Sequence, residues 1–510
     1  MFSSSLSSLL TYYFAMLMIS GISGLLLLHH RIPVGYVRFH IGLVALPPIV
    51  SLVALFNTNM TAIVGPWHLD SLAWLMACFV TTIGLIIQRF SMRYLLGDRS
   101  YRKYFTLFTF LTGTASLAWL SEDLRLLVGF WGATLLGLIY LIRLNKGWKV
   151  TSIAAMLPVR LFTVGWLALL FAIVWLSQVT GNWGLSLALM SDSLGQLGTW
   201  EKTGINLLLV LAVMIPAAGW PFQRWLIESA VVPTPVSAIM HAGIVNAGGI
   251  ILTRFSPLFN GDAAQIVLLV FASISVLIGS GISAVQVDYK RQLVGSTIAQ
   301  MGFMLIQCAL GAYSAAIIHL MLHGLFKATL FLQSGSAVHR YEGTTHVKDR
   351  SSSLWIGAGY VLGLLAGIAL WKTNHVNGYQ LVSAVILGWS LSLSWKQLVA
   401  FSKGIIVRIA GFLLLGGAAA IYFIVHNIFY TLLGTTDFQS GQPNMIVVIL
   451  VISLLILGNV IGIFVTRNRS SAFSAVLYLW LIKLGEANSR SIESHPNYLT
   501  QHLSEGGYQR

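Results

Sequence analysis

The sequence predicts an all-α, polytopic membrane protein. Of its 510 residues, 56% are hydrophobic and only 9% are charged, whereas soluble domains carry about 25% charged residues. Its mean hydropathy is +0.81. Apolar runs of about twenty residues, the length that an α-helix needs to cross hydrocarbon, recur along the whole chain. We therefore expect a multi-pass protein that lies in the lipid bilayer.

The apolar runs predict about 13–15 transmembrane helices. They lie near residues 7–28, 39–56, 70–88, 104–120, 126–142, 153–177, 205–222, 236–253, 264–285, 293–311, 314–334, 354–371, 379–395, 405–433 and 445–466.

Prolines predict a broken helix near residues 205–230. Pro216 and Pro221 each remove a backbone donor and force a break or a kink. Unpaired backbone at membrane depth is tolerated only where protein or water surrounds it. We expect this helix to line a wet or protein-packed interior, as broken helices do in transporters. Downstream, Pro233 and Pro235 begin a helix, where a missing N–H costs little.

The net charge of +15 reflects topology. Of the 30 Lys and Arg residues, 23 lie in the loops after odd-numbered expected helices or in the C-terminal tail, and 4 lie in the loops after even-numbered helices. The protein is expected in the cell's inner (plasma) membrane. By the positive-inside rule, its N-terminus is expected outside the cell and its C-terminus in the cytoplasm. The charge therefore gives no reason to expect binding to nucleic acid.

The chain is expected to form one transmembrane domain, residues 1–466, because no hydrophilic insert is long enough for a soluble domain. Residues 467–510 are expected to be a cytoplasmic tail. Within the tail, the apolar segment 471–484 is too short for a crossing and favours an interfacial or docking helix.

Three basic side chains follow one another within a single apolar run. His319, His323 and Lys327 are four residues apart, so they share one face of a helix. Ionisable groups at that depth are costly unless they meet water or partners. Histidine titrates near neutral pH, and a dehydrated lysine can lose its proton there too, so such a row can carry protons or other ions. The alternative is a helix end whose lysine extends to the membrane surface.

Other polar residues are weaker candidates. His241 stands alone on its helix, where a histidine often serves only packing, and Lys290 belongs to a short basic loop that also fits a topology anchor. Arg160 lies inside a helix and needs a partner, for which Glu228 is a candidate. Hydroxyl and amide groups that could form hydrogen bonds across the interior are Ser296, Thr297 and Gln300.

The sequence has no dinucleotide-binding or Walker motif and no Cys/His cluster at zinc spacing, and its two cysteines, Cys78 and Cys308, lie far apart. We therefore expect no catalytic site, metal site or cofactor in this chain, which is not expected to be an enzyme by itself. Energy would come from an ion gradient or from another subunit.

Three ordered motifs, residues 233–242, 288–302 and 319–327, resemble the antiporter-like proton-conducting membrane subunits. This family includes subunit L of NADH-quinone oxidoreductase, the large Mrp antiporter subunit and DabB of inorganic carbon transporters. The similarity covers residues 65–345 best. It implies that five residues contribute to a polar axis along the bilayer midplane: His241, Lys290, His319, His323 and Lys327.

The sequence also departs from this family. Gly132 follows Trp131 where the family has a glutamate, and Pro216 replaces the lysine that pairs with it. Thr163 stands where an acidic residue is usual. Loss of both pair members is consistent, since one charge left alone in the interior would be costly. The long lateral helix of subunit L is reduced to segment 471–484.

The resemblance implies a membrane ion-conducting subunit of an energy-coupled inorganic carbon (CO2/bicarbonate) transporter, which passes protons or cations to drive a large soluble, zinc-containing, DabA-like partner. The alternative is a proton-translocating subunit of NADH-quinone oxidoreductase or of an Mrp-type cation/proton antiporter. A scaffold without conduction is a third possibility. Titratable His and Lys without a carboxylate cage favour H+ over Na+. Whether Lys372 replaces a lysine of the axis stays open.

Overall fold

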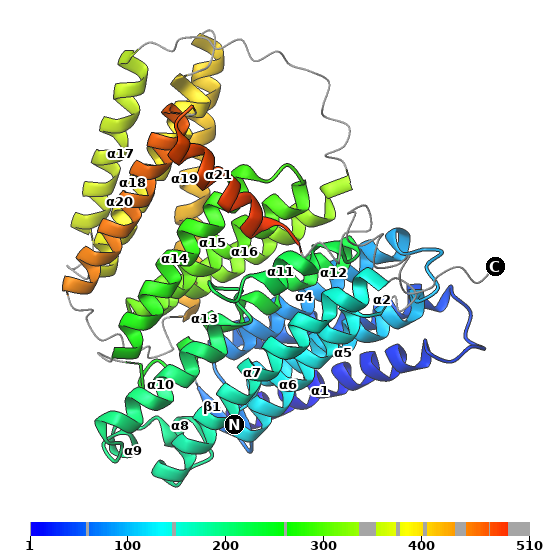
Figure 1. Ribbon diagram of the computed structural model, residues 1–510. Helices are drawn as coiled ribbons and strands as arrows, with labels where there is room; N and C mark the ends of the chain where they lie inside the picture. The colour runs from blue at the N-terminus through cyan, green and yellow to red at the C-terminus, as the bar shows by residue number, and fades with distance from the viewer. Residues whose placement is uncertain are drawn as a thin grey trace, which may run out of the picture.

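The computed structural model confirms the all-α, polytopic architecture (Figure 1). It describes residues 2–57, 61–144, 149–259, 263–335, 353–373, 378–400, 405–433, 445–468 and 470–487. The longer helices are α1 (Phe2–Leu26), α2 (Tyr36–Val44), α3 (Leu46–Asn57), α4 (Ser71–Tyr94), α5 (Tyr101–Leu120), α6 (Leu124–Ile142), α7 (Lys149–Thr180), α10 (Thr199–Met214), α12 (Thr234–Ala242), α13 (Ala247–Arg254), α14 (Ala263–Val285), α15 (Tyr289–Ala309), α16 (Tyr313–Leu332), α17 (Ser353–Thr373), α18 (Gly378–Trp395), α19 (Ile405–Leu433), α20 (Met445–Arg467) and α21 (Ala472–Gly485). Shorter elements are α8 (Leu185–Ala188), α9 (Ser191–Leu194), α11 (Arg224–Glu228), η1 (Ser229–Val231), η2 (Ile244–Asn246), η4 (Lys396–Ala400) and the strands β1 (Ala62–Val64) and β2 (Trp67–Leu69).

Within the described ranges, nine helical segments are long and apolar enough to cross a membrane. They are residues 7–26, 36–57, 71–94, 124–142, 150–180, 234–254, 263–285, 313–332 and 405–433. The other expected spans coincide with helices that are too short or too polar to be counted among these nine, such as α10 and α15. Lys372, whose role the sequence leaves open, lies in α17.

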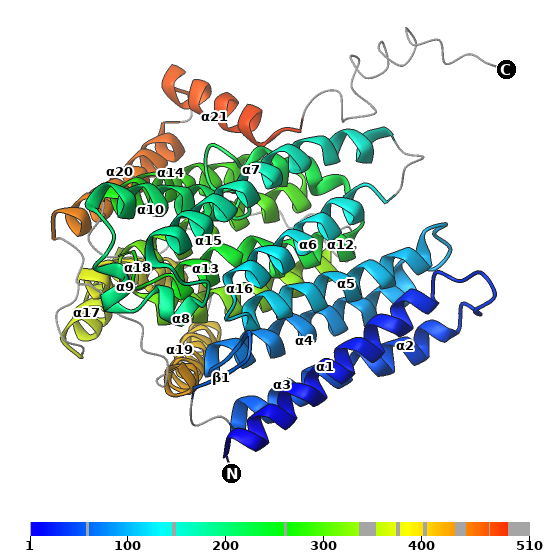
Figure 2. The ribbon, with the colours of Figure 1, turned by 90° about the horizontal axis from the view of Figure 1, so that it is seen from below.

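The helices form one main bundle with a smaller group beside it. In Figure 2, α12, α13 and α16 lie inside the main bundle, between a layer with α4, α5 and α6 and a layer with α7, α10, α14 and α15. Helices α17, α18 and α20 lie beyond α14 (Figure 1), and α19 contacts α16 and α4. The apolar helix α21 packs on α14 and α11.

Helices α14 and α15 pack with their backbones nearly in contact. A Cβ atom at Gly279 would overlap the backbone nitrogen of Ala299, and one at Gly302 would lie 2.7 Å from the carbonyl oxygen of Ala272. Small residues allow such close approach between membrane helices. This packing fixes α15 against α14, and α15 carries Lys290, Ser296 and Thr297.

The predicted break near residues 205–230 is confirmed. Helix α10 ends at Met214, and the chain then turns before α11 begins at Arg224. Side chains bind the backbone groups that the break frees: Trp225 Nε1 donates to the Ile215 carbonyl at 2.8 Å, and the Trp220 N–H donates to Ser275 Oγ at 2.8 Å. Such partners make irregular backbone tolerable inside a membrane bundle.

A second break was not expected from the sequence. We expected one continuous helix near 236–253, but α12 ends at Ala242 and α13 begins at Ala247. Between them the chain forms the short 3-10 turn η2, and Asn246 Nδ2 donates to the Ala242 carbonyl at 2.7 Å. No proline lies at this break. Instead, the Asn246 side-chain amide binds a carbonyl that the interrupted helix leaves free.

Candidate functional site: buried basic residues between α12, α15 and α16

Lys327 is buried inside the bundle, with 1% of its surface exposed. Its Nζ donates to the Leu293 carbonyl at 2.8 Å and to Ser296 Oγ, both on α15. None of the ion pairs found among the described residues includes Lys327. The amine therefore does not extend to the membrane surface, and its neighbours are neutral oxygens rather than a carboxylate.

His241 is linked to Lys327 through α15. Its Nδ1 lies 3.0 Å from Thr297 Oγ1, and Thr297 donates to the Leu293 carbonyl at 2.9 Å, the same carbonyl that accepts from Lys327. Because the Thr297 hydroxyl proton is used there, the hydroxyl accepts from Nδ1–H. Nε2 of His241 is then the atom that can accept a proton. The ring stacks on Phe331 with centroids 4.3 Å apart.

His323 and His319 extend this group along α16. Their ring centroids are 6.1 Å apart, and His319 lies beside Phe303 at 5.4 Å. His323 is buried, and among the described residues no hydrogen-bond partner faces its Nε2. We call His241, His319, His323 and Lys327 the basic cluster. The structure thus brings together four of the five candidate ion-path residues.

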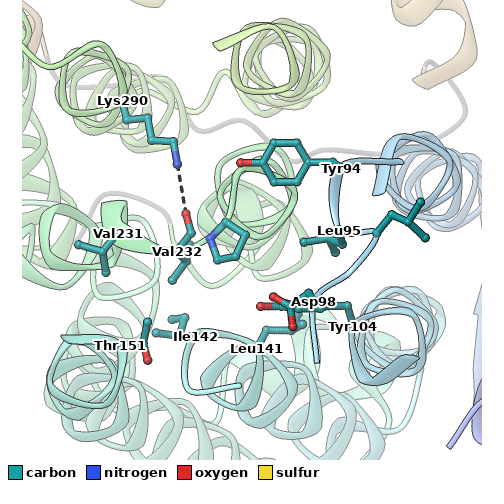
Figure 3. Close-up of a pocket in the computed structure, with 12 residues that line it drawn as sticks. Tyr94, Leu95, Asp98, Tyr104, Leu141, Ile142, Thr151, Val231, Val232 and Lys290 are labelled. Atoms are coloured by element: carbon teal, nitrogen blue, oxygen red, sulfur yellow. Dashed lines mark hydrogen bonds between the residues drawn. The ribbon is translucent and has the colours of Figure 1, made fainter. Parts of the chain in front are cut away.

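The fifth, Lys290, lies at a pocket of about 330 Å³ where α4, α12 and α15 begin or end. Its Nζ donates to the Val232 carbonyl at 3.2 Å (Figure 3). Tyr94 and Asp98 line the other side of the pocket. Lys290 precedes Thr297 by seven residues, or about 10 Å along a helix. This pocket marks the Lys290 end of the bundle.

Two of the supporting residues lie elsewhere than expected. Arg160 is exposed on the surface of α7 and does not pair with Glu228, which is buried near Arg224. Gln300 is also exposed, because α15 turns its small residues toward α14 and its Leu293–Thr297 face toward α12 and α16. The expectation that Gln300 reaches into the interior was therefore wrong.

Tryptophan fills the space beside Gly132. A Cβ atom at this position would lie 2.5 Å from Nε1 of Trp166, which donates to the Val128 carbonyl at 3.0 Å. Trp166 thus closes the place where the resemblance expects a glutamate. At the other missing charge, Pro216, α10 has just ended and Trp225 binds the neighbouring carbonyl of Ile215. An indole group thus lies beside each position where the resemblance expects a charge.

Replacing Gly132 by alanine is expected to destabilise the protein by about 1–3 kcal/mol, because the new methyl group overlaps Trp166. The matched control is Gly129→Ala on the same helix, where nothing lies within 4 Å of the added atom. That change should be neutral or slightly stabilising. Thermal unfolding of both purified variants checks this, and equal melting temperatures would contradict the contact with Trp166.

A second group of charged residues, at the opposite end of α4 from the Lys290 pocket, escaped sequence reasoning. It consists of His68, Asp70, Glu122 and Arg254. Bonded partners in this group are up to 184 positions apart in sequence, so no local spacing signals them. We call this region the His68 end of the bundle.

Comparison with known proteins identifies the family of this chain. Residues 121–409 match the family described as NADH:quinone oxidoreductase/Mrp antiporter, TM, and residues 56–105 match the N-terminus of complex I chain 5. The chain is 66% identical to a protein of Bacillus subtilis (strain 168) named "Probable inorganic carbon transporter subunit DabB", over 98% of this chain and 99% of that protein. The chain belongs to the DabB family of antiporter-like membrane subunits.

The match to this family does not depend on one relative. A protein of Bacillus anthracis with the same printed name is 64% identical over 99% of both chains. The solved Mrp complex from Dietzia sp. DQ12-45-1b contains a similar fold, with a TM-score of 0.58 and 23% identity, over 99% of this chain and 57% of that one. The DabB family membership therefore agrees with the all-α membrane bundle and with the three sequence motifs.

Proposed function

We propose that this chain is the membrane ion-conducting subunit of an energy-coupled inorganic carbon transporter. The full-length relatives named as DabB subunits support inorganic carbon as the transported substrate. The observation that carries the proposal is Lys327, a buried amine that neutral α15 oxygens hold beside two buried histidines. A buried lysine without a carboxylate partner changes its protonation readily.

The proposed path includes the basic cluster and the pocket beside Lys290. Ser296 and Thr297 position the Lys327 amine and the His241 ring. Amines and imidazoles exchange protons, whereas alkali and other hard cations are bound by oxygen ligands. We therefore infer that the ion is H+. Residues 1–466 would carry the path, with the N-terminus outside the cell.

The chemistry on CO2 or bicarbonate would belong to a soluble, zinc-containing, DabA-like partner. Among the described residues there is no group of three or more His, Cys, Asp or Glu side chains that could hold a metal ion. Helix α21, which packs on α14, would help to dock the partner from a cytoplasmic tail, residues 467–510. Proton movement through this chain would drive the partner in one direction.

The test is uptake of labelled bicarbonate by cells that express this chain with a soluble DabA-like subunit. We expect uptake to require both proteins, to fall about ten-fold or more with a protonophore, and to persist when K+ replaces Na+. Uptake that depends on a Na+ gradient would overturn the proton assignment. Copurification with dehydrogenase subunits, without carbon uptake, would favour the respiratory alternative.

A further inference from the structure

At the His68 end, an imidazole lies between two carboxylates. His68 Nδ1 is 2.7 Å from Glu122 Oε2, and His68 Nε2 is 3.5 Å from Asp70 Oδ2. Arg254 donates two hydrogen bonds to Asp70, at 2.6 and 2.9 Å. Glu122 also accepts from the backbone and hydroxyl of Ser186, at 2.8 and 3.0 Å. We call these five residues the His68 cluster.

Distant parts of the chain build this cluster. The hairpin of β1 and β2 delivers His68, and Asp70 caps the first turn of α4. Glu122 precedes α6, Ser186 belongs to α8, and Arg254 ends α13. The hairpin is joined to the loop before α6 by a bridge between Trp67 and Ser121. Because residues from several elements contact His68, we expect its side chain to keep its position when it gains or loses a proton.

Among the four ionisable members of the cluster, His68 is the most open to water. Its side chain is 17% exposed, whereas the side chains of Asp70 and Arg254 are 1% and 8% exposed. The cluster is therefore ordered from the surface inward. His68 can exchange a proton with the surrounding water, and the Asp70–Arg254 pair lies behind it.

A small cavity is lined by residues close in the chain, or hydrogen-bonded, to members of both clusters. Trp119 and Ile250 line it on one side, and the Trp119 carbonyl accepts from Arg254 at 3.3 Å. Ala242, next to His241, and Leu320, one turn before His323, also line it. The cavity is thus lined by near neighbours of both groups of titratable residues.

The cavity is apolar and measures about 30 Å³, room for about two water molecules. Such a cavity stays dry at rest, so it blocks a continuous leak of protons. Asn246 is one of its few polar residues, and its Oδ1 is buried with no hydrogen-bond partner among the described residues. Transient entry of water would be stabilised at this oxygen.

We propose that His68 and Glu122 form the proton-exchange site at this end of the path and that the cavity beneath them is its gate. This inference rests on the proposed function. A proton from surface water binds the His68 imidazole, where both carboxylates stabilise it. When the cavity is hydrated, the imidazolium N–H gives this proton to water, and the water passes a proton to Nε2 of His323. His68 returns to neutral imidazole.

The charges around His68 favour its protonated form. Burial lowers its pKa, but hydrogen bonds to Asp70 and Glu122 outweigh burial and the opposing charge of Arg254, so the pKa of His68 is raised above its usual value. Burial raises the pKa of Glu122, but its bonds to His68 and Ser186 outweigh this effect and lower the pKa overall. Glu122 therefore stays ionised while His68 titrates.

The test compares His68→Gln and Glu122→Gln with Asp123→Asn, which removes an acid at the same end that pairs instead with exposed Arg125. Labelled bicarbonate uptake is measured against external pH in cells that also express the soluble subunit. Wild-type uptake should be full at low pH and fall as pH rises through the raised pKa of His68. The first two variants should lower uptake about ten-fold or more below that pKa and flatten the profile. Asp123→Asn should behave as wild type.

Lys327→Met serves as the reference for the proposed function. If Lys327→Met abolishes uptake while both His68→Gln and Glu122→Gln keep the wild-type pH profile, the exchange site is wrong and the proposed function stands. If Lys327→Met transports as wild type, the proposed function fails. Should His68→Gln not assemble, Glu122→Gln decides, because it keeps a hydrogen-bonding group beside His68. A wild-type profile in that variant would overturn the inference.

Discussion

Replacing Lys327 by methionine is expected to abolish ion-driven uptake without loss of stability. Methionine keeps the length and much of the volume of lysine but cannot hold a proton. The amine is the link between the Ser296 hydroxyl and the Leu293 carbonyl that also binds Thr297. Without it, the basic cluster lacks its connection to α15, and we expect uptake to fall at least about a hundred-fold.

The same substitution separates transport from structure. A buried ammonium group costs several kcal/mol to desolvate, and neutral oxygens offset only part of that cost. An apolar residue of similar volume should leave the protein between about 0 and 3 kcal/mol more stable. Thermal unfolding of the purified complex and labelled bicarbonate uptake measure the two effects.

Lys103→Met is the matched control, because Lys103 is exposed at the start of α5. Its removal takes away the same charge but no buried contact, so uptake should be unchanged. Wild-type uptake by Lys327→Met, in a complex of normal yield, would mean that Lys327 has only a structural role. A large loss of stability in Lys327→Met would contradict the account of an unpaired buried charge.

The second large effect is on stability, at Asp70. This carboxylate is 1% exposed, forms two hydrogen bonds with Arg254 and caps α4 by accepting from the Ala73 N–H at 2.7 Å. Asp70→Ala leaves the Arg254 guanidinium buried without its partner, which costs about 3–5 kcal/mol. Loss of the helix cap adds about 1 kcal/mol. The expected result is a protein that barely accumulates at 37 °C.

Asp123→Ala is a close control for this change. Asp123 also caps a helix, accepting from the Arg125 N–H at 2.8 Å, and also pairs with an arginine. That arginine side chain is 64% exposed, and exposed pairs contribute only about 0–1 kcal/mol. The loss should therefore be close to the cap alone, about 1 kcal/mol. Equal destabilisation by Asp70→Ala and Asp123→Ala would contradict the importance of burial.

A double variant tests the coupling. Arg254→Met combined with Asp70→Asn removes both charges, so it should be more stable than Asp70→Asn alone.

Burial raises the pKa of Asp70, but Arg254 and His68 outweigh it and the pKa lies below its usual value. The contribution of Asp70 to stability is thus fully present above the usual pKa of about 3.9 and is lost as pH falls further. Between pH 5 and 8, titration of the Asp70 carboxylate should therefore not change the difference in melting temperature between wild type and Asp70→Asn.

Local sequence patterns predicted much of the fold and part of the site. Pro216 marked the break after α10, because a missing N–H is a local property of the chain. Four-residue spacing placed His319, His323 and Lys327 along one helix. The break between α12 and α13 was missed, because Asn246 and the surrounding packing produce it without a proline.

The sequence by itself determined that the chain is a helical membrane bundle with basic residues inside it, because hydrophobic length and helical period are local and additive. Only the tertiary structure decided which polar groups meet. It linked His241 to Lys327 through the Leu293 carbonyl, placed Trp166 over Gly132 and assembled the His68 cluster from five separate elements. These contacts join residues distant in sequence, and their geometry depends on how the helices pack rather than on any one segment.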